Sequence, residues 1–339
     1  MRITIRDVAK KAKVSTATVS LVIHGNDRIS KLTRNRVLKA IEELNYYPSR
    51  SARDLVSRKS GNIGFVITED HFLKTEPFYT KIFLGCEFEA RKHPYYVLLA
   101  TINRDYSQDD PLPRFILENS VDGIIIAGSV PDAFITNLQR YNLPTVYIDY
   151  YPEEGEHAAV LIDNLNGAKA AIQHLIDCGH KDIGFIGGDL RHPSIRDRFQ
   201  GYRMTLEMNG ITYRESNAII DEKIISRENG YRATERLLAK NKNITAVFAC
   251  NDAMAIGAMQ YLKEKKLRIP KDVSLIGFDD IESDVFLEPP LTTLSVPKMD
   301  MGSEALRLIS DIIDRGENSP KKVLMPVELV IRKSTCEHK

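Results

Sequence analysis

Cysteine is scarce in this sequence and shows no functional spacing. The four cysteines, Cys86, Cys178, Cys250 and Cys336, lie far apart and form no CxxC pair. Zinc modules and disulfide frameworks both need closely spaced or paired cysteines. We therefore expect no metal site and no structural disulfide, and we expect the chain to work in a reducing cytoplasm.

Long apolar runs and catalytic motifs are also missing. No stretch of eighteen apolar residues occurs, and the N-terminal MRITIRD lacks the apolar core of a signal peptide. The chain is thus expected neither to span a membrane nor to be exported. The GxSxG, P-loop, HExxH and GxGxxG motifs are absent, and the glycine pair of GFIGGD is too weak a signal for dinucleotide binding. We therefore expect neither enzyme activity nor a cofactor.

Length and charge indicate more than one folding unit. A chain of 339 residues exceeds what one compact core usually holds. The net charge of +1 conceals an asymmetry, because residues 1–60 hold 14 Lys and Arg against 5 Asp and Glu, an excess of +9. The remainder holds 33 against 41, an excess of −8. A small basic head on a larger acidic body is expected when only one end binds a polyanion.

The stretch from Ile5 to Gly25, IRDVAKKAKVSTATVSLVIHG, predicts two short helices. The apolar face of the first has helical spacing and consists of Ile5, Val8, Ala9 and Ala12. Ser15 can cap the second helix through its hydroxyl. The buried face of that helix would hold Val19, Val22 and Ile23. Its exposed start then carries small side chains, namely Thr16, Ala17, Thr18 and Ser20.

Small exposed side chains flanked by Lys and Arg suit a helix that enters the DNA major groove. An ordinary amphipathic helical hairpin would show the same spacing. A third helix is predicted over residues 31–44, with Ser30 as its cap. Its apolar face would hold Val37, Leu38, Ile41 and Leu44. Three short helices can bury one another where two cannot, which favours the DNA-binding alternative.

From Asn62 the apolar runs become continuous rather than alternating. They are NIGFVIT, YYVLLAT, DGIIIAG, PTVYID and AAVLID, followed by KDIGFIGG, AIID, TAVFAC and VSLIGF. Continuous runs indicate parallel strands buried on both faces, and helical segments separate them. The pattern predicts two doubly wound α/β lobes whose strand ends and helix starts face a cleft. We expect LTTLSV and a helix near residues 301–315 to return to the first lobe, and VLMPVELVIR to return to the second.

Several motifs occur in a fixed order from about Ile3 to Ser334. They are DVAKKAKVSTATVS, LNYYPSRSARDL, DCGHKDIGFIGG, FACNDAMAIGAM and IGFDDIESDVFLEPPLTTLSVP. In these motifs the chain resembles the lactose-repressor/galactose-repressor family of bacterial transcription regulators. The resemblance implies a homodimeric repressor that binds a palindromic double-stranded DNA operator under the control of a small molecule. The chain ends at STCEHK without the heptad tail of tetrameric relatives, so we expect a dimer.

The resemblance also implies the fold and its divisions. We expect an all-α helix-turn-helix headpiece over residues 1–47 and a hinge over 48–60. A periplasmic-binding-protein-like α/β core of two doubly wound parallel-sheet lobes would occupy 61–339. The first lobe would hold about 61–160 and 292–322, and the second about 161–291 and 323–339.

DNA contacts are carried over from the family residue by residue. They fall on Thr4, Ser15, Thr16, Ala17, Thr18, Ser20, Leu21, His24, Arg50, Ala52, Arg53 and Leu55. In the family the hinge folds into a helix on DNA and wedges a leucine into the minor groove, and Leu55 matches that leucine. Composition alone would make this segment a flexible basic linker. Leu21 stands where many members place a guanine-reading arginine, and His24 replaces a common asparagine, so the operator half-site is expected to differ from the usual one.

An effector pocket is implied in the same way. Its residues are Phe78, Tyr79, Asp149, Asp163, Arg198, Ile225, Asn251 and Asp279. Arg198 in RFQGY would grip the effector with Asp279 opposite, and the aromatic residues would stack on a sugar face or a base. The same residue types also occur as solvated surface arginines, helix caps and core aromatics, and Asp252 and Asp280 suit a cap or turn better than a pocket.

The sequence leaves the class of effector open, and two other functions compete with that of a regulator. A sugar or sugar derivative is the implied effector, and a purine-like corepressor is the nearest alternative. Ile225 stands where relatives often present an aromatic ring, so the effector's identity is not set by the resemblance. A sugar receptor for uptake conflicts with the missing signal peptide and the basic head. An enzyme acting on a sugar or nucleotide would be revealed by turnover.

Overall fold

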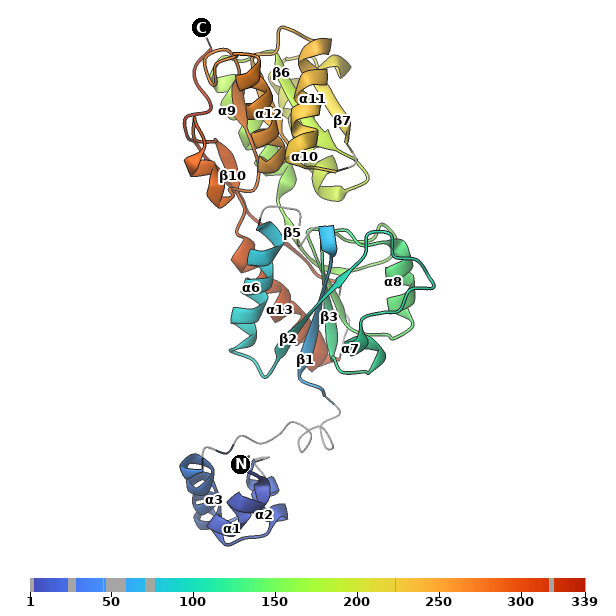
Figure 1. Cartoon of the computed structure of the whole chain (residues 1–339), viewed down its shortest axis with the longest axis vertical. Coiled ribbons are helices and arrows are strands. Elements are labelled where there is room, and N and C mark those ends of the chain that lie inside the picture. Colours follow the sequence, from blue (N-terminus) through green and yellow to red (C-terminus); the bar gives the residue numbers. More distant parts are fainter. Residues whose placement is uncertain are drawn as a thin grey trace. The chain divides into compact units, whose positions relative to one another are not determined.

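The computed structural model divides the chain into two compact units, Met1–Ser60 and Gly61–Lys339. It describes residues 3–23, 29–44, 46, 59–70, 77–222, 224–316 and 320–338. Figure 1 gives the order of the elements along the chain. No helix within these ranges has the length and apolar character needed to cross a membrane.

The first unit contains three helices, α1 (Ile5–Ala12), α2 (Thr16–Ile23) and α3 (Lys31–Glu43). The predicted caps form, because the Ser15 hydroxyl accepts from the Thr18 N–H at 3.1 Å and Ser30 does the same for Thr33 at 3.3 Å. The small core of the unit is built from Val8, Ala9, Ala12, Val19, Val22, Val37, Ala40 and Tyr46. One expectation was wrong: Leu38 is 49% exposed, and Ala40 takes the buried position on α3 instead.

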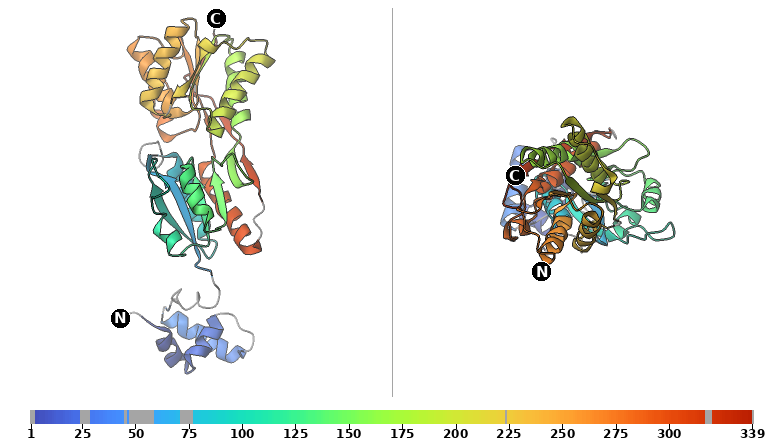
Figure 2. Two further views of the ribbon diagram at one scale, coloured as in Figure 1. Left: turned by 90° about the vertical axis from the view of Figure 1, so that its right-hand side faces the viewer. Right: turned by 90° about the horizontal axis from the view of Figure 1, so that it is seen from above.

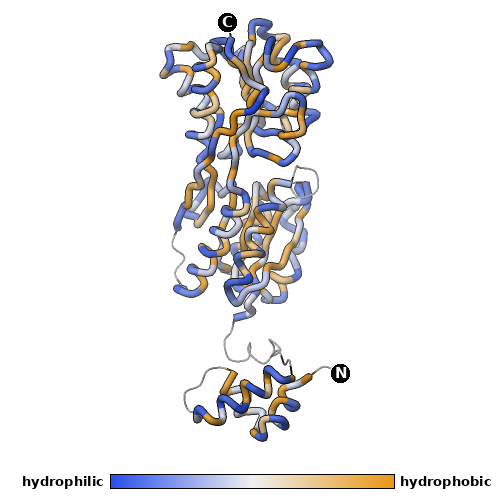
Figure 3. The backbone as a smooth tube through the Cα atoms, turned by 90° about the vertical axis from the view of Figure 1, so that its left-hand side faces the viewer, coloured by the Kyte–Doolittle hydropathy of each residue, from blue (hydrophilic) through white to orange (hydrophobic). Residues whose placement is uncertain are grey.

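The first lobe of the second unit is a six-stranded parallel sheet in the order β11-β5-β4-β3-β1-β2. Its strands are β1 (Asn62–Thr68), β2 (Tyr96–Ile102), β3 (Gly123–Ala127), β4 (Thr145–Ile148), β5 (Ala158–Ile162) and β11 (Lys322–Met325). Helices cover both faces: α6 (Phe78–Ala90) and α13 (Lys298–Arg315) on one, α7 (Arg114–Leu117) and α8 (Asp132–Gln139) on the other (Figures 1 and 2). Apolar residues follow the central strands (Figure 3), which explains their continuous apolar runs.

The second lobe is a four-stranded parallel sheet in the order β7-β6-β8-β9. Its strands are β6 (Ile183–Gly188), β7 (Ala218–Glu222), β8 (Ala246–Ala249) and β9 (Ser274–Ile276). Its helices are α9 (Asn164–Asp177), α10 (Pro193–Met208), α11 (Arg227–Lys240) and α12 (Asp252–Glu264), with the short turns η1 (Glu215–Asn217) and η2 (Glu282–Phe286). Helix α10 begins at Pro193, because proline at the first helical position favours initiation. The two doubly wound lobes expected from the sequence are confirmed.

The segments that return between the lobes differ from the expectation. Strand β10 (Thr293–Ser295), expected in the first lobe, pairs with β12 (Glu328–Val330). Ser295 of β10 bridges to Asp279 of the second lobe, and Thr292, just before β10, bridges to Ile276. Strand β11, expected in the second lobe, pairs with β5 in the first sheet. The boundaries at 292–322 and 323–339 were therefore wrong. VLMPVELVIR is two strands rather than one, because Pro326 cannot donate a backbone hydrogen bond and ends β11 before β12 begins.

Helices α6 and α13 pack closely because both carry glycine at the contact. A Cβ added at Gly302 would lie 1.9 Å from the Ile82 carbonyl oxygen, and one at Gly85 would lie 2.1 Å from that of Met299. The Cys86 thiol donates to the Gly302 carbonyl at 3.1 Å. This close contact fixes the start of α13, where the chain has just returned from the second lobe.

Two buried carboxyl groups lie side by side near this return. Asp252 begins α12 and Asp284 lies in η2, and neither has exposed surface. The Ile281 N–H donates to both, at 3.2 Å and 3.0 Å, and the Thr293 hydroxyl donates to Asp252 at 2.6 Å. Burial raises the pKa of both groups, to about 9 for Asp284, where the nearby Asp252 charge is the second cause. The pair therefore holds a proton at neutral pH and ties η2 and β10 to α12.

We expect this pair to make the chain less stable as pH rises. An unfolded aspartate has a pKa of about 3.9, whereas Asp284 in the folded chain keeps its proton up to about pH 9. The folded chain binds more protons across that window, so its free energy of unfolding falls as pH increases through it. Asp284→Asn keeps a donor for Asp252 but cannot ionise. Its Tm should therefore fall less than that of the wild type between about pH 6 and about pH 9.

Asp311→Asn is the matched control, because that carboxylate is 64% exposed and lies away from the pair. Its Tm profile should follow the wild type. If the Tm of the wild type changed with pH as little as that of Asp284→Asn, the proton held by the Asp252–Asp284 pair would be contradicted.

Candidate functional site

The start of α2 is an exposed surface of small side chains. Thr16 and Ala17 are exposed, whereas Thr18 and Ser20 are half-buried. The hydroxyls of Ser15 and Thr18 lie 2.9 Å apart as part of the helix cap. Thr4 is exposed and caps α1, its N–H and hydroxyl donating to Asp7 at 2.8 Å and 2.7 Å.

The remaining predicted DNA contacts divide into one described and five undescribed residues. Leu21 is 40% exposed, although it is a large apolar side chain. His24, Arg50, Ala52, Arg53 and Leu55 lie outside the described residues. The exposed basic residues described near α2 include Arg6, Lys10, Lys11 and Lys13.

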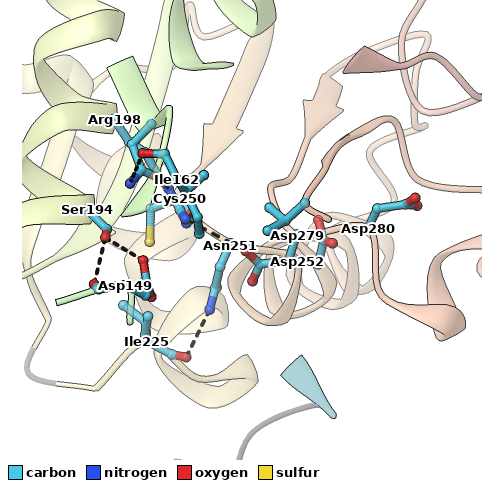
Figure 4. A network of polar contacts seen from close by, with 12 residues as sticks. Asp149, Ile162, Ser194, Arg198, Ile225, Cys250, Asn251, Asp252, Asp279 and Asp280 are labelled. Carbon is cyan, nitrogen blue, oxygen red and sulfur yellow. Dashed lines mark hydrogen bonds and ion pairs between the residues drawn. The ribbon is translucent and has the colours of Figure 1, made fainter. Parts of the chain in front are cut away.

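Arg198 is the centre of the second predicted site. It is only 3% exposed, and its guanidinium lies 3.6 Å from the centre of the Phe278 ring. Nε donates to Asn164 Oδ1 at 2.7 Å and Nη1 donates to the carbonyl of Cys250, while Nη2 faces Asp279 at 3.8 Å. Asn164 begins α9. Cys250 and Asp279 follow the carboxyl ends of β8 and β9 (Figure 4). The alternative of a solvated surface arginine is wrong for Arg198 and holds for Arg191, which is 90% exposed.

Asp279 lies in a strained turn after β9. Its φ is 125° and that of Asp280 is 55°, both in a region that side chains other than glycine rarely adopt. Burial raises the pKa of Asp279 to about 8, and the Arg198 guanidinium opposes this rise. The Lys298 ammonium donates to the carbonyl oxygens of both Asp279 and Asp280, and Arg332 pairs with Asp280 at 2.6 Å. The turn is thus bound through Lys298 to the start of α13, which belongs to the first lobe.

Asp149 joins the two lobes on the other side of the site. Its carboxylate accepts from the Tyr79 hydroxyl at 3.0 Å and from the Ser194 hydroxyl at 2.7 Å. Tyr79 is on α6 of the first lobe, and Ser194 is in the first turn of α10 of the second. Asp149 also has a positive φ of 59°. Burial, followed by the Asp149 charge, raises the pKa of Tyr79 well above its ordinary value, so the phenol stays a donor.

The other predicted pocket residues have structural partners as well. Phe78 packs edge-on against Tyr79 with ring centres 5.0 Å apart. Asn251 caps α12 by accepting from the Met254 N–H at 2.9 Å, and its amide donates to the Ile225 carbonyl at 3.4 Å. Asp163 caps α9 at 3.2 Å and is half-buried.

Contacts thus connect Phe78 with Tyr79, Tyr79 with Asp149, and Arg198 with Asp279. Asn251 and Asp163 act as helix caps, and Ile225 contributes its backbone carbonyl. Asp252, for which a cap or turn was expected, is not the cap of α12: Asn251 is the cap, and Asp252 belongs to the buried carboxyl pair.

Sequence reasoning missed four polar residues of the site: Asn164, His192, Ser194 and Lys298. His192 precedes α10, and its Nδ1 is buried without a hydrogen-bond partner in the described part of the chain. Burial lowers the pKa of His192, which favours a neutral ring. A histidine directly before the proline that starts α10 was the available signal, since helix starts in such lobes face the cleft. Among the described residues no His, Cys, Asp and Glu group is arranged to hold a metal ion.

Comparison with known protein families identifies both parts of the chain. Residues 4–49 match the model of the bacterial regulatory proteins of the lacI family, and residues 172–335 match a periplasmic binding protein-like domain. The chain is 38% identical over 339 residues to the HTH-type transcriptional repressor CytR of Escherichia coli (strain K12), with 98% of this chain and 96% of the relative covered. It is 35% identical over 337 residues to the HTH-type transcriptional repressor PurR of Haemophilus influenzae, with 98% of each covered.

Solved structures agree with this result. The lac repressor dimer bound to operator and the anti-inducer ONPF has a TM-score of 0.80 and 27% identity, with 99% of this chain and 100% of the other covered. The complex of the transcriptional regulator CelR with cellobiose has a TM-score of 0.74 and 31% identity, with 98% and 100% covered. The chain therefore belongs to the lacI family of bacterial regulatory proteins.

Proposed function

We propose that this DNA-binding transcription regulator, a repressor, acts in the cytoplasm and binds a small sugar or sugar derivative around Arg198. The observation that carries the proposal is the pairing of Arg198 with Asp279. Their closest atoms are 3.8 Å apart, which is too long for a hydrogen bond. A ligand hydroxyl between them can accept from the guanidinium and donate to a carboxyl oxygen of Asp279, and neighbouring hydroxyls of a sugar can bond to the other guanidinium N–H groups.

The aromatic residues support a sugar over a flat base. Phe78 and Tyr79 are 8% and 7% exposed, and they pack edge-on against one another. The Tyr79 hydroxyl is already held by Asp149. Little ring face is left for stacking on a purine, whereas a sugar needs mainly polar partners and a small apolar wall. Two similar solved structures are described as bound to cellobiose and to ribose, which agrees with this class.

Control of DNA binding would operate through contacts that cross between the lobes. They are Ser194 with Asp149, Lys298 with the Asp279 turn, and Lys81 with Glu282 at 2.7 Å. A ligand that binds Arg198, Asp279 or Asp149 changes the free energy of this lobe arrangement relative to others. This difference in free energy would couple effector binding to DNA binding by the headpiece. We propose no catalytic role for the site.

The homodimer would form through exposed apolar side chains of the second unit, Gly61–Lys339. On adjacent elements of the first lobe, α6 and the edge strand β2, these are Leu84, Phe88, Tyr96 and Leu99, exposed by 38%, 46%, 65% and 39%. In η2 of the second lobe, Phe286 is 86% exposed. Apolar patches on both lobes suit an extended two-fold interface.

We expect Arg198→Ala to remove the effector response while leaving DNA binding intact. A thermal-shift screen with pentoses, hexoses, disaccharides, sugar phosphates, nucleosides and nucleobases identifies the stabilising class, because a ligand of the folded state raises Tm. Losing two charged hydrogen bonds should weaken the binding of that compound roughly 100-fold. Arg196→Ala, whose side chain is 44% exposed, is the control.

Because removing a buried arginine can destabilise the lobe, Arg198→Lys is measured beside it. Lysine keeps the charge but loses the fork, so it should also bind more weakly. Normal effector affinity in both variants would place the pocket elsewhere, and stabilisation only by nucleobases would replace the sugar with a base.

Removing residues 1–60 should abolish operator binding and leave the core folded. The unit boundary lies at Ser60 and Gly61, and the core has its own apolar clusters. The truncated chain should unfold cooperatively and keep the affinity of the full chain for the stabilising compound within a factor of about 2. Specific operator binding by the truncated chain, measured by gel shift, would contradict this division.

Replacing Tyr96 and Leu99 by glutamate should break the dimer. Two charges on an apolar contact would have to be buried without partners, so the variant should sediment as a monomer and lose affinity for a two-fold operator. Asp105→Lys, an exposed change beyond the end of β2, is the control and should stay dimeric. A double variant that stays dimeric would place the interface on another surface.

A further inference from the structure

Helix α2 presents an apolar stripe on its exposed side. Leu21 is 40% exposed, and Ala17, one helical turn earlier, is also exposed. Residues spaced by four lie on the same face of a helix. Val19 and Val22, on the opposite face, are 0% and 5% exposed and belong to the core of the first unit. Leu21 is therefore held on the outer face of α2 rather than in the core.

The same helix carries no charged side chain. Its sequence is TATVSLVI, so the forked contact of arginine with guanine and the contact of a carboxylate with cytosine are both excluded within α2. Hydroxyl groups can bond to any base pair and discriminate weakly. The groups on α2 that can discriminate strongly are therefore its apolar ones.

We propose that Leu21, supported by Ala17, contacts the C5 methyl of a thymine and so specifies an A·T base pair in each operator half-site. In the major groove the thymine methyl is the one apolar group that a base edge presents. An exposed leucine gains free energy only when an apolar group covers it. The inference rests on the DNA-binding function and adds the base class that this chain reads.

The test begins by selecting binding sites from a random DNA library with the full-length chain. Each thymine of the selected half-site is then replaced by uracil, which removes only the methyl group. A methyl contributes about 0.8 kcal/mol when buried, so one position should weaken binding about 4-fold per half-site at constant salt. Substitutions at the other positions should have smaller effects.

Leu21→Ala should bind thymine and uracil operators with equal affinity at that position. The matched control is Leu38→Ala, since Leu38 is 49% exposed on α3 of the same unit. That variant should keep the full sensitivity to uracil. Leu21→Arg should shift the selected base pair at this position towards G·C, because arginine bonds to guanine in a forked geometry.

The outcomes separate this inference from the function on which it rests. If the library yields no preferred site, DNA recognition itself fails. If a site is found but no uracil substitution weakens binding, or Leu21→Ala stays as sensitive as the wild type, the thymine contact is overturned. If Leu21→Ala changes the oligomeric state and not the base preference, Leu21 is a protein contact instead.

Discussion

The buried guanidinium of Arg198 is the constraint on which the second unit depends. A charge that is 3% exposed is costly unless its donors are paired, and Arg198 meets this need with Asn164, Cys250 and the face of Phe278. These groups come from α9 and from the ends of β8 and β9, so one side chain sets their relative positions. The partner at the longest distance is Asp279, at 3.8 Å, and this is the side of the arginine at which we propose that the effector binds.

Two aspartates with positive φ lie on either side of this centre, and each is tied to the opposite lobe. Asp149 follows strand β4 of the first lobe and accepts from Ser194 of the second. Asp279 follows a strand of the second lobe, and its carbonyl accepts from Lys298 of the first. Strained backbone persists only where its surroundings hold it, so a ligand that changes these hydrogen bonds also changes the restraint on both turns. Under the proposed function, binding and lobe geometry would therefore be linked through the same atoms.

The sequence predicted best what depends on local pattern. The caps at Ser15 and Ser30 and the strands of both sheets follow from spacing and from continuous apolar runs. The family motifs place Asp279 opposite Arg198, and in the structure the two side chains face each other at 3.8 Å. Contacts between distant segments could not be predicted this way. Lys298 looks like an ordinary surface lysine at a helix start, and only the fold places it under the Asp279 turn.

Two of the wrong expectations have physical causes of the same kind. Pro326 divides a run that reads as one strand, so its halves pair in different sheets. Leu38 has the spacing of a core residue, but α3 is covered by only two short helices and cannot bury a wide apolar face. In both cases strand pairing or burial depends on which segments of the folded chain lie nearby, and not on the residue type alone.

In the first unit the charged side chains and the uncharged helix α2 are separate, and this separation bears on how the unit recognises DNA. The excess of +9 over residues 1–60 lies outside α2, on neighbouring segments such as α1 and α3. Phosphate contacts position a protein on the duplex, whereas contacts with base edges carry sequence information. A helix without charge contributes little to the salt-dependent affinity, so substitutions in α2 should alter which site is chosen more than how strongly DNA is held. Basic residues of α1 and α3 would act in the opposite way, because the counterions they release do not depend on the base sequence.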